Sequence, residues 1–390
     1  MKILSIETSC DETSVALIEK ISQREYKVLS HETISQINFH REYGGVYPAL
    51  SRREHEKNLV PLLHKVLSDS GMLKPNETSK DNLIEILGTD IELIERYPDL
   101  KENTFDLFSK FRIESIDYIS VTNGPGLPPA LWVGVNFAKV LSILLYGTPI
   151  YPINHMEGHI IGAISDRTED VVEIKKINYS AISLLISGGH TEIVLSTKAG
   201  EYSKIGETQD DAVGEAYDKV ARLLCLPYPG GPEIGRLAEE GRKNNLNNLK
   251  FPRPMLHTKD LNFSFSGLKT HVLYFIRDYE KELDEDIKIQ IATEFEEAVK
   301  DVLVHKVKNA IEQTSSQTLV VGGGVASNQY LRENFEDLSR SLGIELFISS
   351  KELSTDNALM IALCAANQIE NGVEPTKNFL AVGSKKYEWK

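Results

Sequence analysis

Two histidines four residues apart, in His155-Met-Glu-Gly-His159, form the sharpest chemical signal in the sequence. On a helix, residues i and i+4 lie on one face, so both imidazoles can hold the same metal ion. A helix-borne zinc protease needs glutamate directly after its first histidine, whereas this chain has Met156 there and Glu157 one place later. The spacing predicts a chelating pair without protease geometry; two unrelated histidines near a helix start are the alternative.

A metal ion held by two histidines needs at least one more ligand, and a carboxylate suits a hard or borderline ion. The candidate is Asp356, in Ser354-Thr-Asp-Asn357, just before the apolar run from Ala358 to Ala366. Aspartate in front of such a run is also typical of a helix N-cap. On its own, Asp356 fits a helix cap better than a metal ligand. Only the larger pattern of motifs in the chain favours the role of a ligand.

Glycine-rich turns offer backbone N–H groups that no side chain shields, which suits close approach of a phosphate or carboxylate. Three such turns are Ser187-Gly-Gly-His-Thr191, Gly322 to Gly324 followed by Asn328, and Tyr228-Pro-Gly-Gly-Pro232. For each turn taken alone, a tight change of chain direction explains the glycines as well or better.

Two charged clusters have an ordinary and a functional interpretation. The acidic cluster comprises Asp210, Asp211, Glu215 and Asp218, and the basic cluster comprises Arg52, Arg53, His55 and Lys57. A solvated helix face explains either cluster, and a phosphate contact is the functional alternative for the basic one.

The elements that must position these residues follow an α/β pattern. Residues 3–6 and 15–18 predict two strands around a polar turn, and residues 181–186 and 193–195 repeat this hairpin around Ser187 to Thr191. The same supersecondary unit therefore opens each half of the chain. Residues 318–321 predict a further strand that enters a glycine turn and then a helix.

Helical patterns fill the intervals between these strands. Apolar stripes predict helices over 48–67 and 287–311, and Pro61 is expected to break or restart the first. Residues 74–113 differ, with many acidic residues among scattered Leu and Ile, and predict an acidic, partly helical surface insertion. Strands that alternate with helices predict an α/β fold.

Composition and net charge limit the kinds of protein that this chain can be. The 390 residues, 41% hydrophobic and 26% charged, are typical of a soluble globular chain of two or three domains. The net charge of −14 means that any nucleic-acid role needs a local basic face or a basic partner. Three distant cysteines, Cys10, Cys225 and Cys364, fit free thiols in a reducing compartment, and no apolar run is long enough for a membrane span. The sequence predicts a cytoplasmic protein without membrane contact.

Taken in order, the motifs resemble the TsaD family of tRNA N6-adenosine threonylcarbamoyltransferases, once labelled glycoproteases. The matching stretches are IETSCDETSVAL, YGGVYPALSRREH, NGPGLPPALWVG, HMEGH, LLISGGHT, GETQDDAVGEAYDK, YPGGPEI, FSFSGLKT, GGGVASNQYLR and STDNALMIA. They cover nearly the whole chain apart from the insertion at 74–113, and the histidine in SGGHT resembles the bacterial branch.

The resemblance implies a two-lobed actin-like, sugar-kinase-like (ASKHA) fold around a central cleft, which agrees with the repeated hairpin. The expected parts are an N-terminal lobe over 1–150, a C-terminal lobe over 151–355, and a C-terminal helix and tail over 356–390 that return to the N-terminal lobe. The implied reaction transfers the threonylcarbamoyl group of threonylcarbamoyl-AMP to N6 of the adenosine 3′ of the anticodon, in tRNAs that read codons beginning with A. AMP leaves.

By matching position, the resemblance implies one divalent metal ion, iron or else zinc, on His155, His159 and Asp356. The residues implied to contact the adenylate are Leu185, Ile186, Ser187, Gly188, Gly189, Asp218, Gly231 and Asn328. The bases that could take the proton of the attacking amine are Asp11, Glu12 and His190, although the first two also suit capping of a hairpin turn. Many relatives have an acidic residue shortly after the YPGGP loop, where this chain has Gly235.

A small-molecule kinase or ATPase of the same fold is the main alternative. Such an enzyme needs a carboxylate to place Mg²⁺ and the γ-phosphate, whereas the two-histidine site suits a leaving AMP better. A non-catalytic scaffold is a third hypothesis. For the transferase, the resemblance implies tRNA as substrate and two partner subunits, a TsaB-like pseudo-paralogue and a small TsaE-like ATPase.

Overall fold

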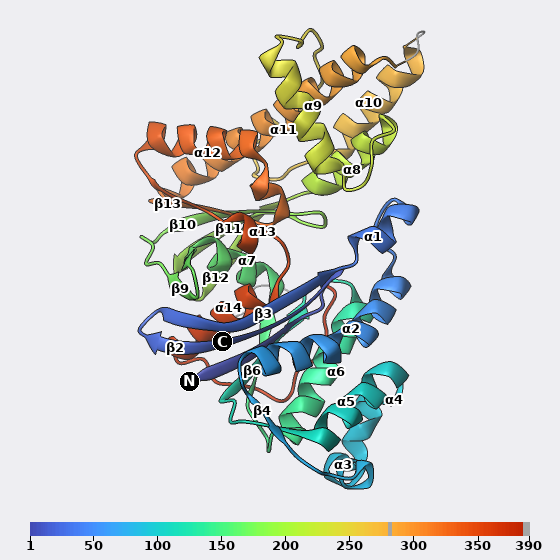
Figure 1. Ribbon diagram of the computed structural model, residues 1–390. Helices are drawn as coiled ribbons and strands as arrows, with labels where there is room; N and C mark the ends of the chain where they lie inside the picture. Colours follow the sequence, from blue (N-terminus) through green and yellow to red (C-terminus); the bar gives the residue numbers. More distant parts are fainter. Residues whose placement is uncertain (280–282, 385–390) are drawn as a thin grey trace. The chain divides into compact units, whose positions relative to one another are not determined.

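The computed structural model describes residues 1–279 and 283–384 (Figure 1). The chain forms two compact units: unit 1 comprises residues 1–175 and resumes at 356, and unit 2 comprises residues 176–355. The predicted lobes divide at residue 150. Unit 1 runs on to residue 175 because the strands between these positions belong to its sheet.

Unit 1 is built on a seven-stranded sheet with the order β7-β6-β1-β2-β3-β9-β8. Its strands are β1 (Lys2–Glu7), β2 (Glu12–Ser22), β3 (Glu25–Ser35), β6 (Tyr118–Gly124), β7 (Ile150–Asn154), β8 (Ser165–Thr168) and β9 (Val171–Ile174). The predicted first hairpin is confirmed, because β1 pairs antiparallel with β2 and places Ile6 opposite Val15. On its other side β1 pairs parallel with β6.

Helices α2 (Pro48–Asp69), α6 (Pro128–Leu144), α7 (His155–Ala163) and α14 (Ala358–Glu370) pack on this sheet. Alternate residues of the hairpin, Leu4, Ile6 and Val15, join the apolar core formed with α2 and α6. The expected break at Pro61 is wrong, since α2 continues through it. Its buried stripe packs on both sides of the proline and outweighs one missing backbone hydrogen bond.

The predicted insertion is helical, which confirms that part of the expectation. Between β4 (Leu73–Pro75) and β5 (Phe111–Ile113) lie α3 (Lys80–Leu87), η2 (Gly88–Ile91), α4 (Glu92–Glu95) and α5 (Pro98–Lys110). Most of its apolar residues, among them Leu83, Leu87 and Leu100, are buried against α2 and α6, at the foot of Figure 1. Ile84 and Ile86 of α3 remain exposed with the acidic residues, so the insertion thickens the core of unit 1 and also forms part of its surface.

Unit 2 repeats the central part of unit 1. Its sheet has the order β12-β11-β10-β13-β14, formed by β10 (Ala181–Ile186), β11 (Thr191–Lys198), β12 (Glu201–Glu207), β13 (Thr318–Gly322) and β14 (Glu345–Ile348). As with β1, strand β10 pairs antiparallel with the next strand and parallel with a later one, β13. The second predicted hairpin and the duplication are therefore confirmed.

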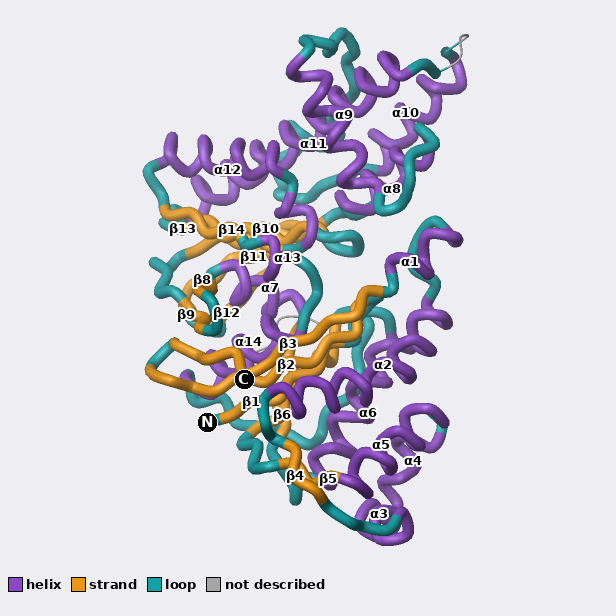
Figure 2. The backbone as a smooth tube through the Cα atoms, viewed as in Figure 1, coloured by secondary structure: helices purple, strands orange, loops and turns teal. Residues whose placement is uncertain are grey.

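The helices of unit 2 are α8 (Val213–Leu223), α9 (Gly230–Lys243), α10 (Ser266–Asp278), α11 (Glu285–Thr314), α12 (Gln329–Leu342) and α13 (Lys351–Ser354), with the short η3 (Gly324–Ser327) (Figure 2). The helix predicted over 287–311 is α11, which begins after the N-cap Asp284. Among the described residues of both units, no helix is long and apolar enough to cross a membrane.

Candidate functional site

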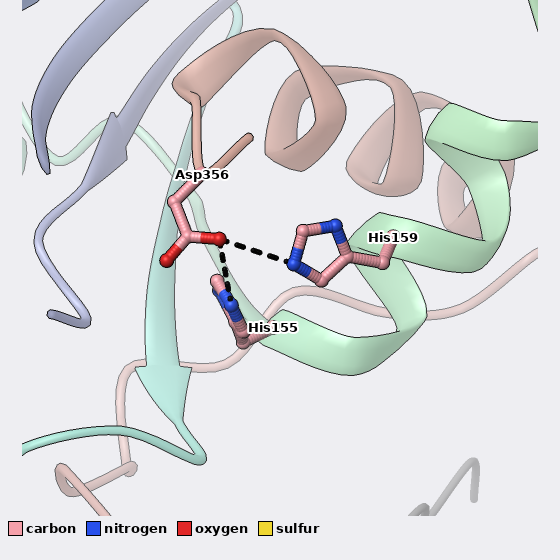
Figure 3. Close-up of side chains that lie close together, drawn as sticks. All are labelled: His155, His159 and Asp356. Carbon is pink, nitrogen blue, oxygen red and sulfur yellow. Dashed lines mark hydrogen bonds and ion pairs between the residues drawn. The ribbon is translucent and has the colours of Figure 1, made fainter. Parts of the chain in front are cut away.

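The two histidines and the aspartate predicted as metal ligands meet in unit 1 (Figure 3). Helix α7 begins at His155 because the Asn154 side chain caps it, accepting hydrogen bonds from the N–H groups of Met156 and Glu157. Both imidazoles then lie on one face of α7, and Asp356 reaches them from the start of α14. Both histidines are buried, and Asp356 is partly exposed.

The distances from Asp356 to the two histidines suit one shared ion. Asp356 Oδ1 lies 3.3 Å from His155 Nε2 and 3.1 Å from His159 Nε2, and the ligand atoms of the three residues lie within 4.8 Å of one another. Two ligand atoms that each bind an ion at about 2.1 Å are about 3.0 to 3.4 Å apart in tetrahedral or octahedral geometry. Two imidazoles and a carboxylate are also the donor set that iron and zinc accept, so these residues fit the ion.

The second nitrogen of His155 faces another carboxylate. His155 Nδ1 lies 3.2 Å from Glu7 Oε2 and 3.3 Å from Ser9 Oγ. Glu7 is fully buried at the end of β1 and also accepts a hydrogen bond from the Thr122 hydroxyl. A carboxylate behind a ligating histidine fixes the ring orientation and the tautomer, with Nε2 left for the ion. By contrast His159 Nδ1 is buried with no hydrogen-bond partner among the described residues.

Electrostatics agree with a cation at this place. Burial favours neutral His155, but the charges of Asp356 and Glu7 outweigh it and raise the pKa of His155 well above its ordinary value. Burial would raise the pKa of Asp356, yet the two histidines hold it well below its ordinary value. Two carboxylates therefore flank one imidazole, and a positive charge between them balances the cluster.

The alternative role of Asp356 as a helix cap is wrong. The N-cap of α14 is the next residue, Asn357, whose side chain accepts a hydrogen bond of 2.9 Å from Met360 N–H. Asp356 is thus free of capping, and its carboxylate points at the histidines.

Two of the three predicted proton acceptors, Asp11 and Glu12, lie at the turn between β1 and β2. Ser35 donates a 3.0 Å hydrogen bond to Glu12 Oε1. Burial and the nearby charges of Asp11 and Asp356 raise the pKa of Glu12 well above its ordinary value. A carboxyl group with a raised pKa suits proton transfer near neutral pH. The third, His190, lies in unit 2 at the equivalent turn between β10 and β11.

The predicted adenylate contacts lie together in unit 2, at the ends of neighbouring elements. Leu185 and Ile186 are buried at the end of β10, and the exposed glycines of the Ser187 turn follow them. The Ser187 hydroxyl accepts hydrogen bonds from the N–H groups of Gly189 and His190, at 3.3 and 3.1 Å. Ligands of α/β folds bind at this edge, where parallel strands end.

The glycine turn after β13 packs beside the end of β10. Gly323 has φ 92°, and a Cβ there would lie 2.4 Å from the Ile186 carbonyl oxygen, so only glycine fits. Gly231 differs, because a Cβ there would meet nothing within 4 Å. Asp218 accepts a 2.7 Å hydrogen bond from Gly230 N–H and so ties α8 to the start of α9.

Asn328 has a structural task as well as a predicted binding one. Its Oδ1 caps α12 by accepting from Leu331 N–H at 3.0 Å, and its Nδ2 donates to buried Glu296 at 2.7 Å. Gly235 lies beside this pair: a Cβ on it would be 3.6 Å from Asn328 Nδ2 and 3.7 Å from Glu296 Oε1. The carboxylate next to this position therefore comes from α11.

The two charged clusters are mostly structural. Asp210 accepts hydrogen bonds from Ser264, Phe265 and Ser266 and thus joins two sequence motifs, and Asp211 pairs with Lys219 at 2.7 Å. In the basic cluster Arg52 and Lys57 pair with glutamates of α2, and His55 is buried. Arg53 remains exposed.

Sequence reasoning missed Glu7. It stands at the end of the apolar strand β1, and no pattern in the sequence connects it with the histidines. The signal that could have found it is chemical: a histidine that binds metal needs a hydrogen-bond acceptor for its other nitrogen.

A family model described as "TsaD: tRNA N6-adenosine threonylcarbamoyltransferase" matches residues 27–78 and 102–363. A protein of Thermosipho africanus with the name tRNA N6-adenosine threonylcarbamoyltransferase is 39% identical over 382 residues, 98% of each chain. The chain belongs to the TsaD family. A relative of the same name from Nitrosospira multiformis is 37% identical and aligns with 95% of this chain and 92% of its own.

The TsaD family model has no counterpart for residues 79–101, the larger part of the predicted insertion. Among solved structures, the phosphate- and nucleotide-bound form of HypF has a TM-score of 0.54 at 15% identity. The match covers 96% of this chain and 47% of that one, and it shows the fold alone. The predicted α/β fold of the actin-like, sugar-kinase-like class is confirmed, and the relatives' names support the transferase over the kinase alternative.

Proposed function

We propose that this chain transfers the threonylcarbamoyl group of threonylcarbamoyl-AMP to N6 of an adenosine in tRNA. The target is the adenosine 3′ of the anticodon in tRNAs that read codons beginning with A. The observation that carries the proposal is the near full-length match to relatives named for this transfer. The cytoplasm, expected from the sequence, is the location that suits such a substrate.

The reaction forms one bond and breaks another. The N6 amine attacks the carbonyl carbon of the threonylcarbamoyl group, and the bond between that carbon and the phosphate oxygen of AMP breaks. AMP leaves with the electron pair. The amine is a weak nucleophile, so its orientation against the carbonyl matters most. Its proton goes to a nearby base, for which Glu12 and Asp11 are the candidates in unit 1 and His190 is the candidate in unit 2.

His155, His159 and Asp356 would hold one divalent metal ion, iron in the first place and zinc as the alternative. When bound, such an ion stabilises the negative charge that develops on the oxygens of the donor. Glu7 orients His155 for that task by accepting the hydrogen bond of Nδ1.

Leu185 to Gly189, Asp218, Gly231 and Asn328 would bind the adenylate in unit 2. The exposed glycines of the Ser187 turn leave the backbone open to a phosphate. The open space at Gly231 gives room for a nucleoside. TsaB-like and TsaE-like subunits are the proposed protein partners, since the net charge of −14 disfavours tRNA binding by the chain alone.

The test measures transfer of labelled threonine from threonylcarbamoyl-AMP to an unmodified tRNA that reads an A-starting codon, with and without the proposed partners. Wild type is compared with His159→Ala and with His64→Ala, a matched control because His64 is exposed on α2. We expect labelled tRNA with wild type and the control, and a loss of at least about a hundredfold with His159→Ala. If wild type gives no labelled tRNA even with partners and metal, the kinase becomes the better hypothesis. Phosphorylation of a small molecule by this protein would then support it.

A further inference from the structure

Unit 1 displays an aromatic patch on the segment between β3 and α2. We define the aromatic patch as Phe39, Tyr43 and Tyr47, which have 51%, 61% and 54% of their surface exposed. The neighbouring Ile34 is also exposed, by 37%. Grouped apolar side chains on a protein surface mark a place where something binds.

The patch is held by a folded turn. The rings of Tyr43 and Tyr47 stack with centroids 5.7 Å apart and an angle of 22°. Between them Gly44 adopts φ 64°, which favours glycine. Beneath them His40 is fully buried, with Nε2 3.3 Å from Gln36 Oε1 and Nδ1 accepting from Tyr47 N–H at 3.4 Å. The aromatic rings are therefore presented outward by a built turn.

The patch adjoins the turn that carries the candidate bases. The N–H group of Gln36 donates to the Asp11 carbonyl oxygen at 2.9 Å, and Ser35 donates to Glu12 Oε1 at 3.0 Å. The segment that bears the aromatic rings thus starts directly beside Asp11 and Glu12.

The segment itself is locally basic, with acidic residues on both sides of it: Asp11 and Glu12 at the adjoining turn, and Glu54 and Glu56 in α2, where Glu56 pairs with Arg52. Residues 37–53 contain three arginines and one glutamate, whereas the chain has a net charge of −14. Arg41 and Arg53 are exposed. Cations next to exposed aromatic rings form the combination that binds single-stranded nucleic acid, with bases on the rings and phosphates on the arginines.

We propose that the aromatic patch stacks the unpaired nucleotides that flank the target adenosine in the tRNA loop. The inference rests on the proposed function. A loop base that reaches the turn at Asp11 and Glu12 brings its neighbours with it, and unstacked loop bases need an aromatic surface to replace the stacking they lose. Tyr43 and Tyr47 provide that surface.

The test uses an anticodon stem–loop RNA with 2-aminopurine next to the target adenosine, because stacking on an aromatic ring quenches its fluorescence. Wild type is compared at low salt with the double variant Tyr43→Ser/Tyr47→Ser. The control is Tyr146→Ser, which removes a tyrosine that is 99% exposed elsewhere in unit 1. We expect quenching by wild type and by the control, and a Kd at least about tenfold weaker for the double variant. With the partner subunits present, the KM for tRNA should rise while the KM for threonylcarbamoyl-AMP stays the same.

Equal quenching and equal KM for the double variant and wild type would overturn the inference. The inference would also be overturned if the double variant binds RNA like wild type but is defective in the transfer assay with the partner subunits. In that case the patch would dock a protein and not the RNA. The quenching assay measures RNA binding and does not require transfer. If quenching depends on the aromatic patch but no tRNA is modified, the inference about the patch is supported and the proposed function is refuted.

Discussion

His155 is hydrogen-bonded at both ring nitrogens, with Glu7 behind it and Asp356 in front. The spacing of the two histidines could be predicted from the sequence because i and i+4 share a helix face. Glu7 could not, because it is 148 residues from His155 in the chain and the two meet only where the fold brings the end of β1 to the start of α7. Sequence spacing therefore finds candidate ligands that share one helix. It misses their hydrogen-bond partners when these lie on other elements.

Glu7→Gln should weaken metal binding about tenfold to a hundredfold, because the amide lacks the charge that makes His155 a strong ligand. Affinity is measured by competition with a chromophoric chelator, on protein that has been stripped of metal and reloaded with zinc or iron(II). Glu85→Gln, which changes an exposed glutamate of α3, is the control and should bind like wild type. An unchanged affinity for Glu7→Gln would show that His155 needs no support from Glu7.

His55 should make the protein sensitive to mild acid. It is fully buried, with Nδ1 2.7 Å from Thr13 Oγ1 and Nε2 3.1 Å from the Cys10 carbonyl oxygen, and burial lowers its pKa to about 4. In the unfolded chain the ring titrates near its ordinary value of about 6.5. Its contribution to stability is therefore present above pH 6.5 and is lost as the pH falls toward 4.

Between pH 7 and pH 5 this loss amounts to about 1.8 kcal/mol of the free energy of unfolding. Urea denaturation of wild type and His55→Gln at both pH values measures it, because glutamine keeps hydrogen-bonding groups and does not titrate. The variant should be less stable at pH 7 and show the smaller drop on acidification. Equal drops in the two proteins would mean that folding does not lower the pKa of His55.

At the scale of elements, the close approach of α7 and α14 brings the three proposed metal ligands together. Gly158 lies at the contact, where a Cβ would be 2.9 Å from Ile361 Cδ1 and 3.4 Å from Met360 Cγ. The nearest atom is the end of a flexible side chain, so alanine can be accommodated by a small shift. A larger side chain has to push the helices apart.

Gly158→Leu should therefore lower the free energy of unfolding by about 1 to 3 kcal/mol and also weaken metal binding, because α14 carries Asp356 away from the histidines. Gly158→Ala is the matched control and should keep the metal stoichiometry of wild type. Denaturant titration and metal analysis after dialysis measure the two effects. Full metal content in Gly158→Leu would show that the ligands do not depend on this helix contact.

Element prediction succeeded where the local pattern decides the structure. Both hairpins followed from apolar strands around polar turns, and α11 followed from its apolar stripe. It failed at Pro61, where packing overrides a local preference. The start of α14 at Ala358 was predicted correctly, and only the alternative role of Asp356 as its cap was wrong, because Asn357 is the cap. Two adjacent polar residues fit a cap equally well until the helix register is known.

At the scale of the molecule, the duplicated plan could be predicted because the hairpin repeats in the sequence. The order of strands could not, since the parallel pairs β1 with β6 and β10 with β13 join segments more than a hundred residues apart. The chain has no local signal for such pairs. The placement of the proposed adenylate-binding residues along one edge of the unit 2 sheet depends on this order.

The net charge of −14 predicts weak binding of tRNA by the chain alone. At physiological salt we expect a Kd weaker than about 1 µM, because the arginines near the aromatic patch are few. Binding should become tighter as the salt concentration falls, because contacts between arginines and phosphates release counterions. Filter binding or anisotropy with a labelled tRNA over a series of salt concentrations measures both. Nanomolar binding by the isolated chain at physiological salt would contradict the proposed need for partner subunits.

The division of unit 1 into two stretches of sequence has a consequence for biosynthesis. Unit 2 is one continuous stretch, so it can fold as soon as it leaves the ribosome. Unit 1 must wait, because α14 and Asp356 are translated after all of unit 2. A nascent chain that ends at residue 355 carries both histidines without their carboxylate, so the proposed metal site is completed only near the end of translation.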